Sequence, residues 1–343
     1  MFQRERVEIK TAEQIRLMRR AGLVTAEGLR AMGAAVRPGV TTAELDRIGR
    51  RVLAEHGARS NFLDYGADWG YPPYPGVVCI SVNEVVVHGI PGGRVLEEGD
   101  IVSIDFGAIV DGWHGDAART FPVGEVDGAS CALSETTRRS MWDGIARIRV
   151  GARVGDVSHG VEASLHSHGR PYGILREYTG HGIGTAMHQP PDVPNYGRPG
   201  KGPRIVAGMC LCVEPMATLG GEDVAELDDG WTVVTCDSSR AAHWENTVAV
   251  LPDGHRARRG QGRAGGQGSA LRVPRLSPGP FRRVFLSSCA VGGGCLRLCT
   301  GGVVCVRLGA GAASRRAESA GGGPPEFSTG LAGIVRVRES WAP

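Results

Sequence analysis

Apolar residues recur at helical spacing in two early segments of the chain. The first stripe contains Ile15, Met18, Leu29 and Met32. The second contains Leu45, Ile48 and Val52. Thr11 with Gln14, and Thr41 with Glu44, are the residue pairs of a capping box at a helix start, and Gly57 is a suitable stop. The pattern therefore predicts two consecutive helices.

Six later runs are rich in β-branched residues and are bounded by Gly, Pro or Asp, which is typical of β-strands. They read VVCISVNEVVVHGI, IVSIDFGAIV, WHGDAARTF, GMCLCVE, WTVVTCD and NTVAVL. Another helical stripe, from Ser134 through Met141 and Ile145 to Ile148, separates the third run from the fourth. Strands and helices thus alternate in groups along the chain.

One predicted hairpin brings two carboxylates onto the same face of a sheet. Asp111-Gly112 favours a two-residue turn, and counting back from it sets Gly107 opposite Asp116. Asp105 then lies on the face of Asp116, about 7 Å away along the diagonal. A bulge at the turn would change this parity. Two such carboxylates either lie solvated at a sheet edge or surround a cation.

A weak internal repeat relates two parts of the chain at an offset of 112 residues. The identical pairs are Arg37 and Arg149, Gly39 and Gly151, Leu53 and Leu165, His56 and His168, and Gly57 and Gly169. Helix signals precede both copies. We therefore expect an α+β fold of two related halves, with a functional site at the seam between them.

Charge divides the chain near residue 253. Residues 254–343 hold 14 Arg, no Lys and three Glu, a net charge of +11, whereas residues 1–253 hold 25 basic and 33 acidic side chains, a net charge of −8. The second region is rich in Gly, Arg, Ser and Pro without a sustained apolar period, so we expect a disordered tail. It could be an appendage without function, an RNA-binding segment, or a frameshift product of GC-rich sequence.

The nine cysteines are odd in number and irregularly spaced, which favours a reduced, cytoplasmic protein over a disulfide framework. Cys295, Cys299 and Cys305 lack zinc-finger spacing. The start, MFQRERVEIK, lacks the apolar segment of a signal peptide, and Arg297 and Arg307 interrupt the apolar stretch 290–313. We therefore expect neither export nor a membrane span.

Three further polar residues lie in or beside apolar runs. Glu214 ends GMCLCVE, Glu245 precedes NTVAVL, and His181 lies in TGHGIG. Each alone is more often a solvated strand end or a loop residue. With Asp105 and Asp116 they supply a charge of −4, which two divalent ions would neutralise. This oxygen-rich set without cysteine favours Mn, Co, Fe(II) or catalytic Zn, and a pair of such ions activates water for hydrolysis.

Five segments, in this order, resemble those of type I methionine aminopeptidases. They are VVCISVNEVVVHGIP, SIDFGAIVDGWHGDAARTF, YTGHGIGTAMHQPPDVPNYG, GMCLCVEPMATL and DDGWTVVTCDSSRAAHWENTVAV. The similarity runs from about Ile9 to Leu251. It implies the pita-bread fold and removal of the initiator methionine from nascent proteins when the second residue is small. Type II enzymes carry an insertion between the equivalents of His181 and Glu214. These two residues are only 33 positions apart here, which favours type I.

The resemblance also implies roles for single residues. Asp116 and Glu245 would bridge two metal ions, His181 and Glu214 would complete one ion site, and Asp105 would complete the other. His88 and His188 would bind the scissile amide and the tetrahedral intermediate, and with Glu214 they form the expected catalytic set. The methionine pocket would contain Tyr71, Tyr74, Cys79, Met187 and Trp231.

Some positions depart from the family pattern. Asp68 and the proline-rich YPPYPG lie near the expected pocket, and Asn246 stands where histidine is common. No role is assigned to His114 or His243. Two alternatives remain, an Xaa-Pro aminopeptidase, expected to carry a large N-terminal domain, and a pita-bread protein without catalysis or metal, expected to lack some ligands. The expected partners are N-termini of nascent chains and, transiently, the ribosome, without membrane or specific DNA binding.

Overall fold

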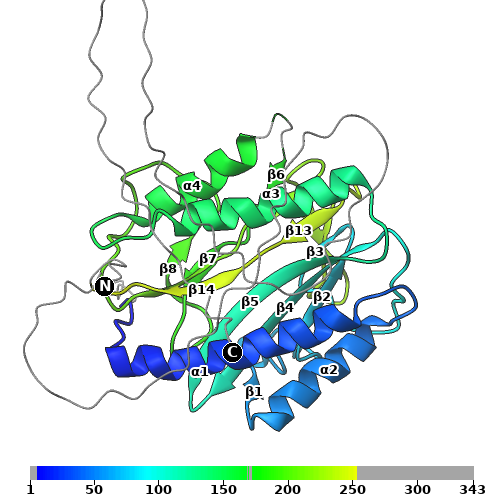
Figure 1. Cartoon of the computed structure of the whole chain (residues 1–343), viewed down its shortest axis with the longest axis horizontal. Helices are drawn as coiled ribbons and strands as arrows, with labels where there is room; N and C mark the ends of the chain where they lie inside the picture. The colour runs from blue at the N-terminus through cyan, green and yellow to red at the C-terminus, as the bar shows by residue number, and fades with distance from the viewer. Residues whose placement is uncertain (1–5, 168, 170–171, 253–343) are drawn as a thin grey trace, which may run out of the picture. The chain divides into compact units, whose positions relative to one another are not determined.

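The computed structural model describes residues 6–252, except 168 and 170–171 (Figure 1). The predicted boundary after residue 253, the tail 254–343 and His168 of the repeat lie outside these residues. Within the described part of the chain, no helix combines the length and the apolar character needed to cross a membrane.

The described part of the chain contains four α-helices, which form two pairs. They are α1 (Ala12–Ala35), α2 (Thr42–Glu55), α3 (Gly128–Ile145) and α4 (Val154–His166). Both predicted capping boxes, at Thr11 and at Thr41, are present. The third helix was predicted to start at Ser134, but it begins earlier because the Asp127 side chain accepts the first free backbone N–H groups. It also ends before Ile148.

The described strands form four sheets. The first contains β1 (Arg59–Ser60), β4 (Ile101–Val110), β2 (Cys79–Val82) and β5 (Trp113–Pro122). The second contains β13 (Ala241–His243), β10 (Met216–Thr218) and β6 (Gly173–Ile174). The third contains β11 (Val224–Glu226), β12 (Val233–Thr235) and β3 (Val85–Val87). The fourth contains β14 (Asn246–Ala249), β9 (Cys210–Val213), β7 (Gly180–Gly182) and β8 (Gln189–Val193).

The run VVCISVNEVVVHGI is two strands and not the single strand that the sequence predicted. Asn83 adopts a φ of 54° after β2 and turns the chain, so that β2 pairs with β4 while β3 pairs with β12. The strands that the sequence did not predict are β1, β6, β7, β8, β10, β11 and β13, which span only two to five residues each. Segments this short do not show a measurable alternation of apolar and polar residues.

The predicted hairpin is confirmed. Asp111 and Gly112 have φ values of 51° and 81°, the left-handed pair that a tight hairpin turn requires. Gly107 pairs with Asp116 as predicted, and the register of β4 and β5 runs without a bulge. Asp105 and Asp116 therefore share one face of the sheet.

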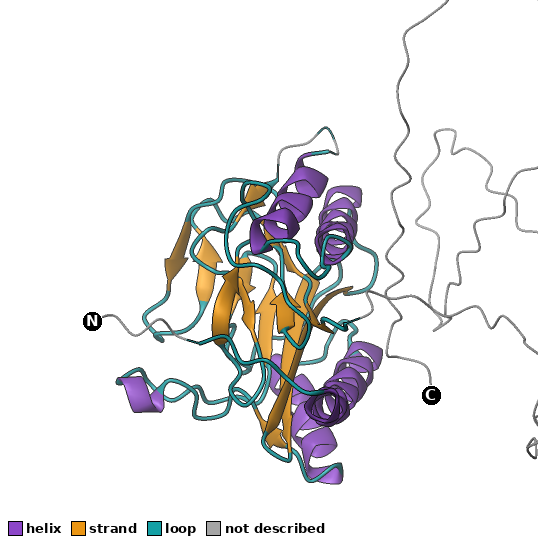
Figure 2. Cartoon of the chain, turned by 90° about the vertical axis from the view of Figure 1, so that its left-hand side faces the viewer, coloured by secondary structure: helices purple, strands orange, loops and turns teal. Residues whose placement is uncertain are grey.

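Each helix pair packs on its own hydrophobic core. Leu29, Leu45 and Phe106 belong to the core beneath α1 and α2, and Leu133 and Leu165 to the core beneath α3 and α4. Figure 2 shows the two helix pairs on opposite sides of the strands. Gly39 and Gly151, equivalent in the repeat, have nearly equal φ values of 88° and 91°. The two related halves are confirmed.

Strands β5 and β14 meet where the halves join. The Glu245 N–H donates to the Ala118 carbonyl at 3.0 Å, and the Ala118 N–H donates to the Glu245 carbonyl at 3.4 Å. Asp116 adds a contact, because its N–H donates to Thr247 Oγ1 at 3.3 Å. This pairing brings a carboxylate of one half beside a carboxylate of the other.

Candidate active site

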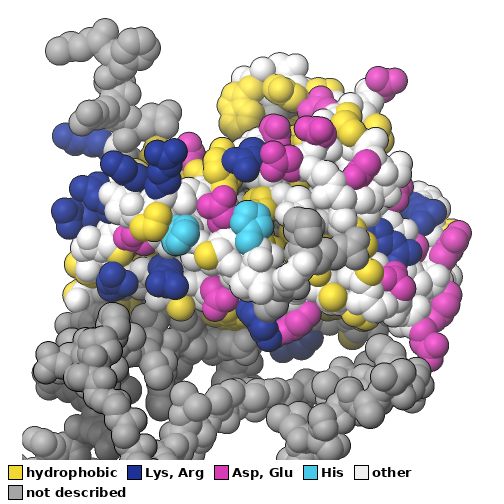
Figure 3. Space-filling model, turned by 90° about the horizontal axis from the view of Figure 1, so that it is seen from above, with side chains coloured by type: hydrophobic (Ala, Val, Ile, Leu, Met, Phe, Trp, Pro, Cys, Tyr) yellow, Lys and Arg dark blue, Asp and Glu magenta, His cyan; other side chains and the backbone are white. Residues whose placement is uncertain are grey.

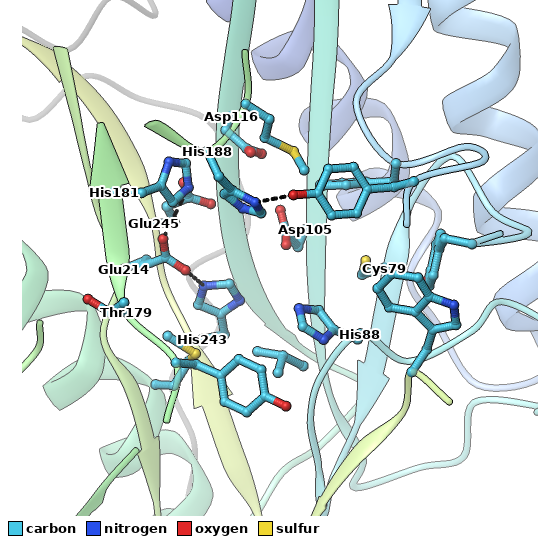
Figure 4. A pocket seen from close by; sticks show the side chains of 18 of the residues that line it. Cys79, His88, Asp105, Asp116, Thr179, His181, His188, Glu214, His243 and Glu245 are labelled. Carbon is cyan, nitrogen blue, oxygen red and sulfur yellow. Dashed lines mark hydrogen bonds and ion pairs between the residues drawn. The ribbon is translucent and has the colours of Figure 1, made fainter. Parts of the chain in front are cut away.

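A cavity of about 330 Å³ lies at this seam (Figure 4). Its lining includes the five predicted metal ligands and both predicted catalytic histidines, namely Asp105, Asp116, His181, Glu214, Glu245, His88 and His188. Asp105 and Asp116 come from the β4–β5 hairpin. His181 is the middle residue of β7, Glu214 follows β9, and Glu245 precedes β14. Both halves contribute.

The possible ligand atoms form two groups that share one residue. Oxygens of Asp105, Asp116 and Glu245 lie within 4.8 Å of one another, and so do donor atoms of His181, Cys212 and Glu245. Glu214 lies beside the second group, because its Oε1 is 3.4 Å from His181 Nε2. The arrangement suits two adjacent cations with a shared carboxylate.

Cys212 was missing from the predicted set, which contained no sulfur. The sequence did hold a signal, since Cys212 lies two residues before Glu214 and residues at that spacing face the same side of a strand. His243 lines the cavity although no role was predicted for it, and its Nε2 lies 3.7 Å from Glu214 Oε2.

The carboxylates are buried without compensation. Asp105 Oδ1, Asp116 Oδ1, Glu214 Oε1 and Glu245 Oε1 have no hydrogen-bond partner among the described residues. Burial raises the pKa of Asp116 to about 7, although Asn61 donates a hydrogen bond to it. Burial, with the charges of neighbouring carboxylates, raises the pKa of Asp105, Glu214 and Glu245 well above the usual range. No described Lys or Arg lines the cavity. The donor set fits divalent cations.

His181 is set up as a neutral ligand. Its Nδ1 lies 2.9 Å from the Gly182 carbonyl, to which it can only donate, so Nε2 is left with a free lone pair. Burial lowers the pKa of His181 to about 4. A neutral imidazole is the form that binds metal.

The two other predicted histidines are neutral as well. Burial lowers the pKa of His88 to about 4. Burial, together with the repulsion that a charged His188 would meet from the protonated forms of neighbouring histidines, lowers the pKa of His188 to about 3. The Tyr65 hydroxyl contacts His188 Nδ1. Burial raises the pKa of Tyr65 to about 12, so this hydroxyl keeps its proton.

The apolar part of the cavity contains four of the five predicted pocket residues, Tyr74, Cys79, Met187 and Trp231, together with Phe62 and Tyr65. Tyr71 does not line the cavity. It is 53% exposed and contacts Trp231, with ring centroids 5.9 Å apart. Tyr65 lines the cavity in its place.

The loop between residues 64 and 74 explains this exchange. Asp64 N–H donates to the Tyr74 carbonyl at 2.9 Å and Tyr74 N–H to the Tyr65 carbonyl at 3.0 Å, which closes the loop. The intervening 3₁₀ turn, η1 (Ala67–Trp69), stands away from the strands in Figure 2 and is exposed, Asp68 included. Asn246, the other departure from the family pattern, lies outside this loop. Its side-chain oxygen accepts a hydrogen bond from Arg119 at 2.6 Å.

Comparison with known proteins identifies the family. Residues 16–252 match the model of metallopeptidase family M24. Methionine aminopeptidase 1 of Mycobacterium tuberculosis is 50% identical over 252 residues, covering 72% of this chain and 92% of the relative. Methionine aminopeptidase 1 of Bacillus subtilis is 41% identical over 245 residues, covering 71% and 96%.

Solved structures give the same answer. The methionine aminopeptidase of Rickettsia prowazekii is 38% identical, with a TM-score of 0.68 over 72% of this chain and 96% of that one. An Xaa-Pro dipeptidase of Bacillus anthracis shares the fold alone, at 21% identity and a TM-score of 0.56, and only 60% of its chain is covered. The chain belongs to metallopeptidase family M24, among its methionine aminopeptidases, and has their pita-bread fold.

Proposed function

We propose that this protein removes the initiator methionine from nascent proteins by metal-dependent hydrolysis. The observation that carries the proposal is a set of four carboxylates, each with a buried oxygen that has no hydrogen-bond partner among the described residues, and one neutral imidazole at the wall of a cavity with an apolar part. Such a cavity can hold a methionine side chain next to the reacting carbonyl.

Two divalent ions, Mn, Co, Fe(II) or Zn, would be held by these residues. Asp116 and Glu245 would be shared, His181 and Glu214 would complete one site, and Asp105 would complete the other. The ions would polarise the scissile carbonyl and lower the pKa of a shared water towards neutrality. Glu214, beside His181, would accept a proton from the attacking water.

The chain's histidines bind the substrate. We assign the Tyr65 hydroxyl, which keeps its proton, as the donor to His188 Nδ1; His188 then carries its own proton on Nε2 and can donate it to a substrate oxygen. His88, at a φ of 59°, is held in a backbone conformation that few residues of its type adopt. Both residues stay neutral, so they act as hydrogen-bond donors at neutral pH.

Tyr65→Phe tests the first of these assignments. Loss of the hydroxyl removes one hydrogen bond that orients His188, so turnover should fall about fivefold while bound metal stays constant. Tyr71→Phe is the matched control, because Tyr71 lies outside the cavity, and it should leave turnover unchanged. Steady-state kinetics and metal analysis of both variants decide the matter. Equal effects of the two substitutions would contradict a role for Tyr65.

Substrate choice should depend on the residue after methionine. The carboxylates and histidines crowd the space beside the cleaved bond, so Met-peptides with Gly, Ala, Ser, Thr, Pro, Val or Cys in second place should be cleaved fastest. Competition between Met-Ala and Met-Leu peptides in one reaction measures this ratio. A preference for Met-Leu or Met-Lys would be incompatible with the crowded site.

The decisive test of the activity itself is release of methionine from a Met-Ala-Ser peptide. Release should require a divalent ion, stop with a chelator, and return when Mn²⁺ or Co²⁺ is added. Peptides that begin with Xaa-Pro and lack methionine should remain intact. Release that persists without any metal would overturn the proposal.

We assign this activity to the cytoplasm, supported by the free thiols of Cys79, Cys210 and Cys212.

The +11 charge of residues 254–343 supports transient ribosome binding by that segment. In Figure 3, by contrast, basic and acidic side chains both occur on the face of the catalytic domain that is shown. Truncation after Asp253 should leave peptide cleavage unchanged and weaken salt-sensitive ribosome cosedimentation, whereas lost cleavage would show that the boundary is wrong.

A further inference from the structure

We propose that Cys212 is a metal ligand, which gives the ion site at His181 a sulfur, nitrogen and oxygen donor set that favours thiophilic divalent ions such as Zn²⁺ and Cd²⁺. This inference rests on the proposed function and refines its metal site. The ligands implied by the family resemblance contain no sulfur.

The sheet places Cys212 beside this site. Strand β9 lies between β14 and β7, Cys212 pairs with Thr247 of β14, and the neighbouring strand β7 carries His181. Alternation along β9 sets Cys212 on the face of Glu214, while Leu211 and Val213 pack into the core beneath α3 and α4. The thiol therefore lies on the side of His181 and Glu245, at the edge of a small apolar cluster with Trp113 and Ile183, and outside the core beneath α3 and α4.

Distances and burial support ligation. The Cys212 sulfur, a His181 nitrogen and a Glu245 oxygen all lie within 4.8 Å of one another, a spread that one cation can bridge after small side-chain movements. All three residues are buried. Glu245 Oε1 has no hydrogen-bond partner among the described residues, so an unsatisfied, buried acceptor points to the same space.

The thiol is weakly held by other partners. Cys212 Sγ lies 3.4 Å from Thr247 Oγ1, whose own proton is donated to the Asp116 carbonyl at 2.8 Å. Ligation costs this long contact and the hydrogen bond between the thiol and the Glu245 carboxylate. When the sulfur–metal bond forms, the thiol proton leaves to solvent and the thiolate contributes one negative charge to the cation.

A thiolate changes which ion the site prefers. Carboxylate oxygens and imidazole alone suit Mn²⁺, whereas a sulfur ligand adds affinity for softer ions. The competing arrangement keeps Cys212 protonated as a hydrogen-bond donor to Thr247 or Glu245, with no bond to metal. Both arrangements give an active enzyme, so spectra and not activity must separate them.

Co²⁺ binding to the full-length, metal-free protein distinguishes them. Under anaerobic conditions, a cobalt–thiolate bond gives an intense near-ultraviolet charge-transfer band. We expect this band in the unsubstituted protein and in Cys210→Ser, and its loss in Cys212→Ser. Cys210 is the matched control, because it lies on the same face of β9 but outside the ligand group. Absence of the band in the unsubstituted protein with cobalt bound would overturn the proposal.

Relative affinity provides a second measurement. Loss of a residue that merely orients a ligand costs about 10- to 100-fold in metal affinity, so Cys212→Ser should lose at least about tenfold for Zn²⁺ relative to Mn²⁺. Circular dichroism and melting temperature verify that the variant is folded. An unchanged Zn²⁺ to Mn²⁺ ratio would overturn ligation by sulfur. If the unsubstituted protein releases methionine but shows no cobalt–thiolate band, only the inference about Cys212 is refuted. If it shows the band but releases no methionine, only the proposed function is refuted.

Discussion

Asp116→Ala is expected to lower metal-dependent methionine release by about 100-fold or more. Asp116 belongs to the group with Asp105 and Glu245, and its loss removes one proposed ligand and one carboxylate together. Since loss of a residue that only hydrogen-bonds a ligand already costs about 10- to 100-fold, loss of the ligand itself should cost at least as much. Single-turnover kinetics and metal analysis of the purified variant measure the effect.

Two comparisons make this result specific. Glu55→Ala removes an exposed carboxylate at the end of α2 and should leave both activity and bound metal unchanged. His88→Ala should lower turnover far more than metal content, because His88 is proposed to contact substrate and not metal. Full activity of Asp116→Ala would rule out the two-ion site.

Removal of metal should make the contribution of Asp116 to stability depend on pH. In the metal-free protein, burial raises the pKa of Asp116 to about 7, above its value in the unfolded chain. At Asp116 the folded state therefore binds more protons than the unfolded state between about pH 4 and about pH 7, so the contribution of this carboxyl to the free energy of unfolding falls as pH rises through this window. The lowered pKa values of buried His88, His181 and His188 contribute with the opposite sign below about pH 6.5. For Asp116 alone the loss approaches about 4 kcal/mol.

Thermal unfolding followed by circular dichroism measures this effect. Between about pH 4 and about pH 7, the melting temperature of the metal-free protein should fall relative to that of metal-free Asp116→Asn, and added Mn²⁺ should raise the melting temperature of the unsubstituted protein most at the upper end. Asp116→Asn is the reference because its amide does not titrate, while the histidines contribute equally in both proteins. A difference between the two metal-free proteins that moves in the opposite direction with pH would contradict the predicted sign.

The sequence predicted the parts of the site that depend on local rules. Asp111-Gly112 determines a turn type, the turn determines the register, and the register places Asp105 and Asp116 on one face. The capping residues Thr11 and Thr41 mark the starts of two helices for the same reason, since each satisfies backbone groups within its own turn.

Features that depend on distant contacts were not predictable in this way. Tyr65 and Tyr71 are the same residue type in one loop, and only the backbone pairing of residues 64 and 65 with Tyr74 decides which of them lines the cavity. Cys212 was overlooked because buried cysteine in a strand is ordinarily a small apolar residue. Its proximity to His181 comes from the pairing of β7 with β9, which are remote in sequence.

The joint between β5 and β14 has a consequence for how the protein could be divided. A break in the chain between β5 and α3 would separate Asp105 and Asp116 from His181, Glu214 and Glu245, and would leave each hydrophobic core with its own helix pair. Each fragment would carry a like-charged, incomplete set of ligands. Reassembly of the two fragments would then require divalent ions, and restored peptidase activity would report the complementation.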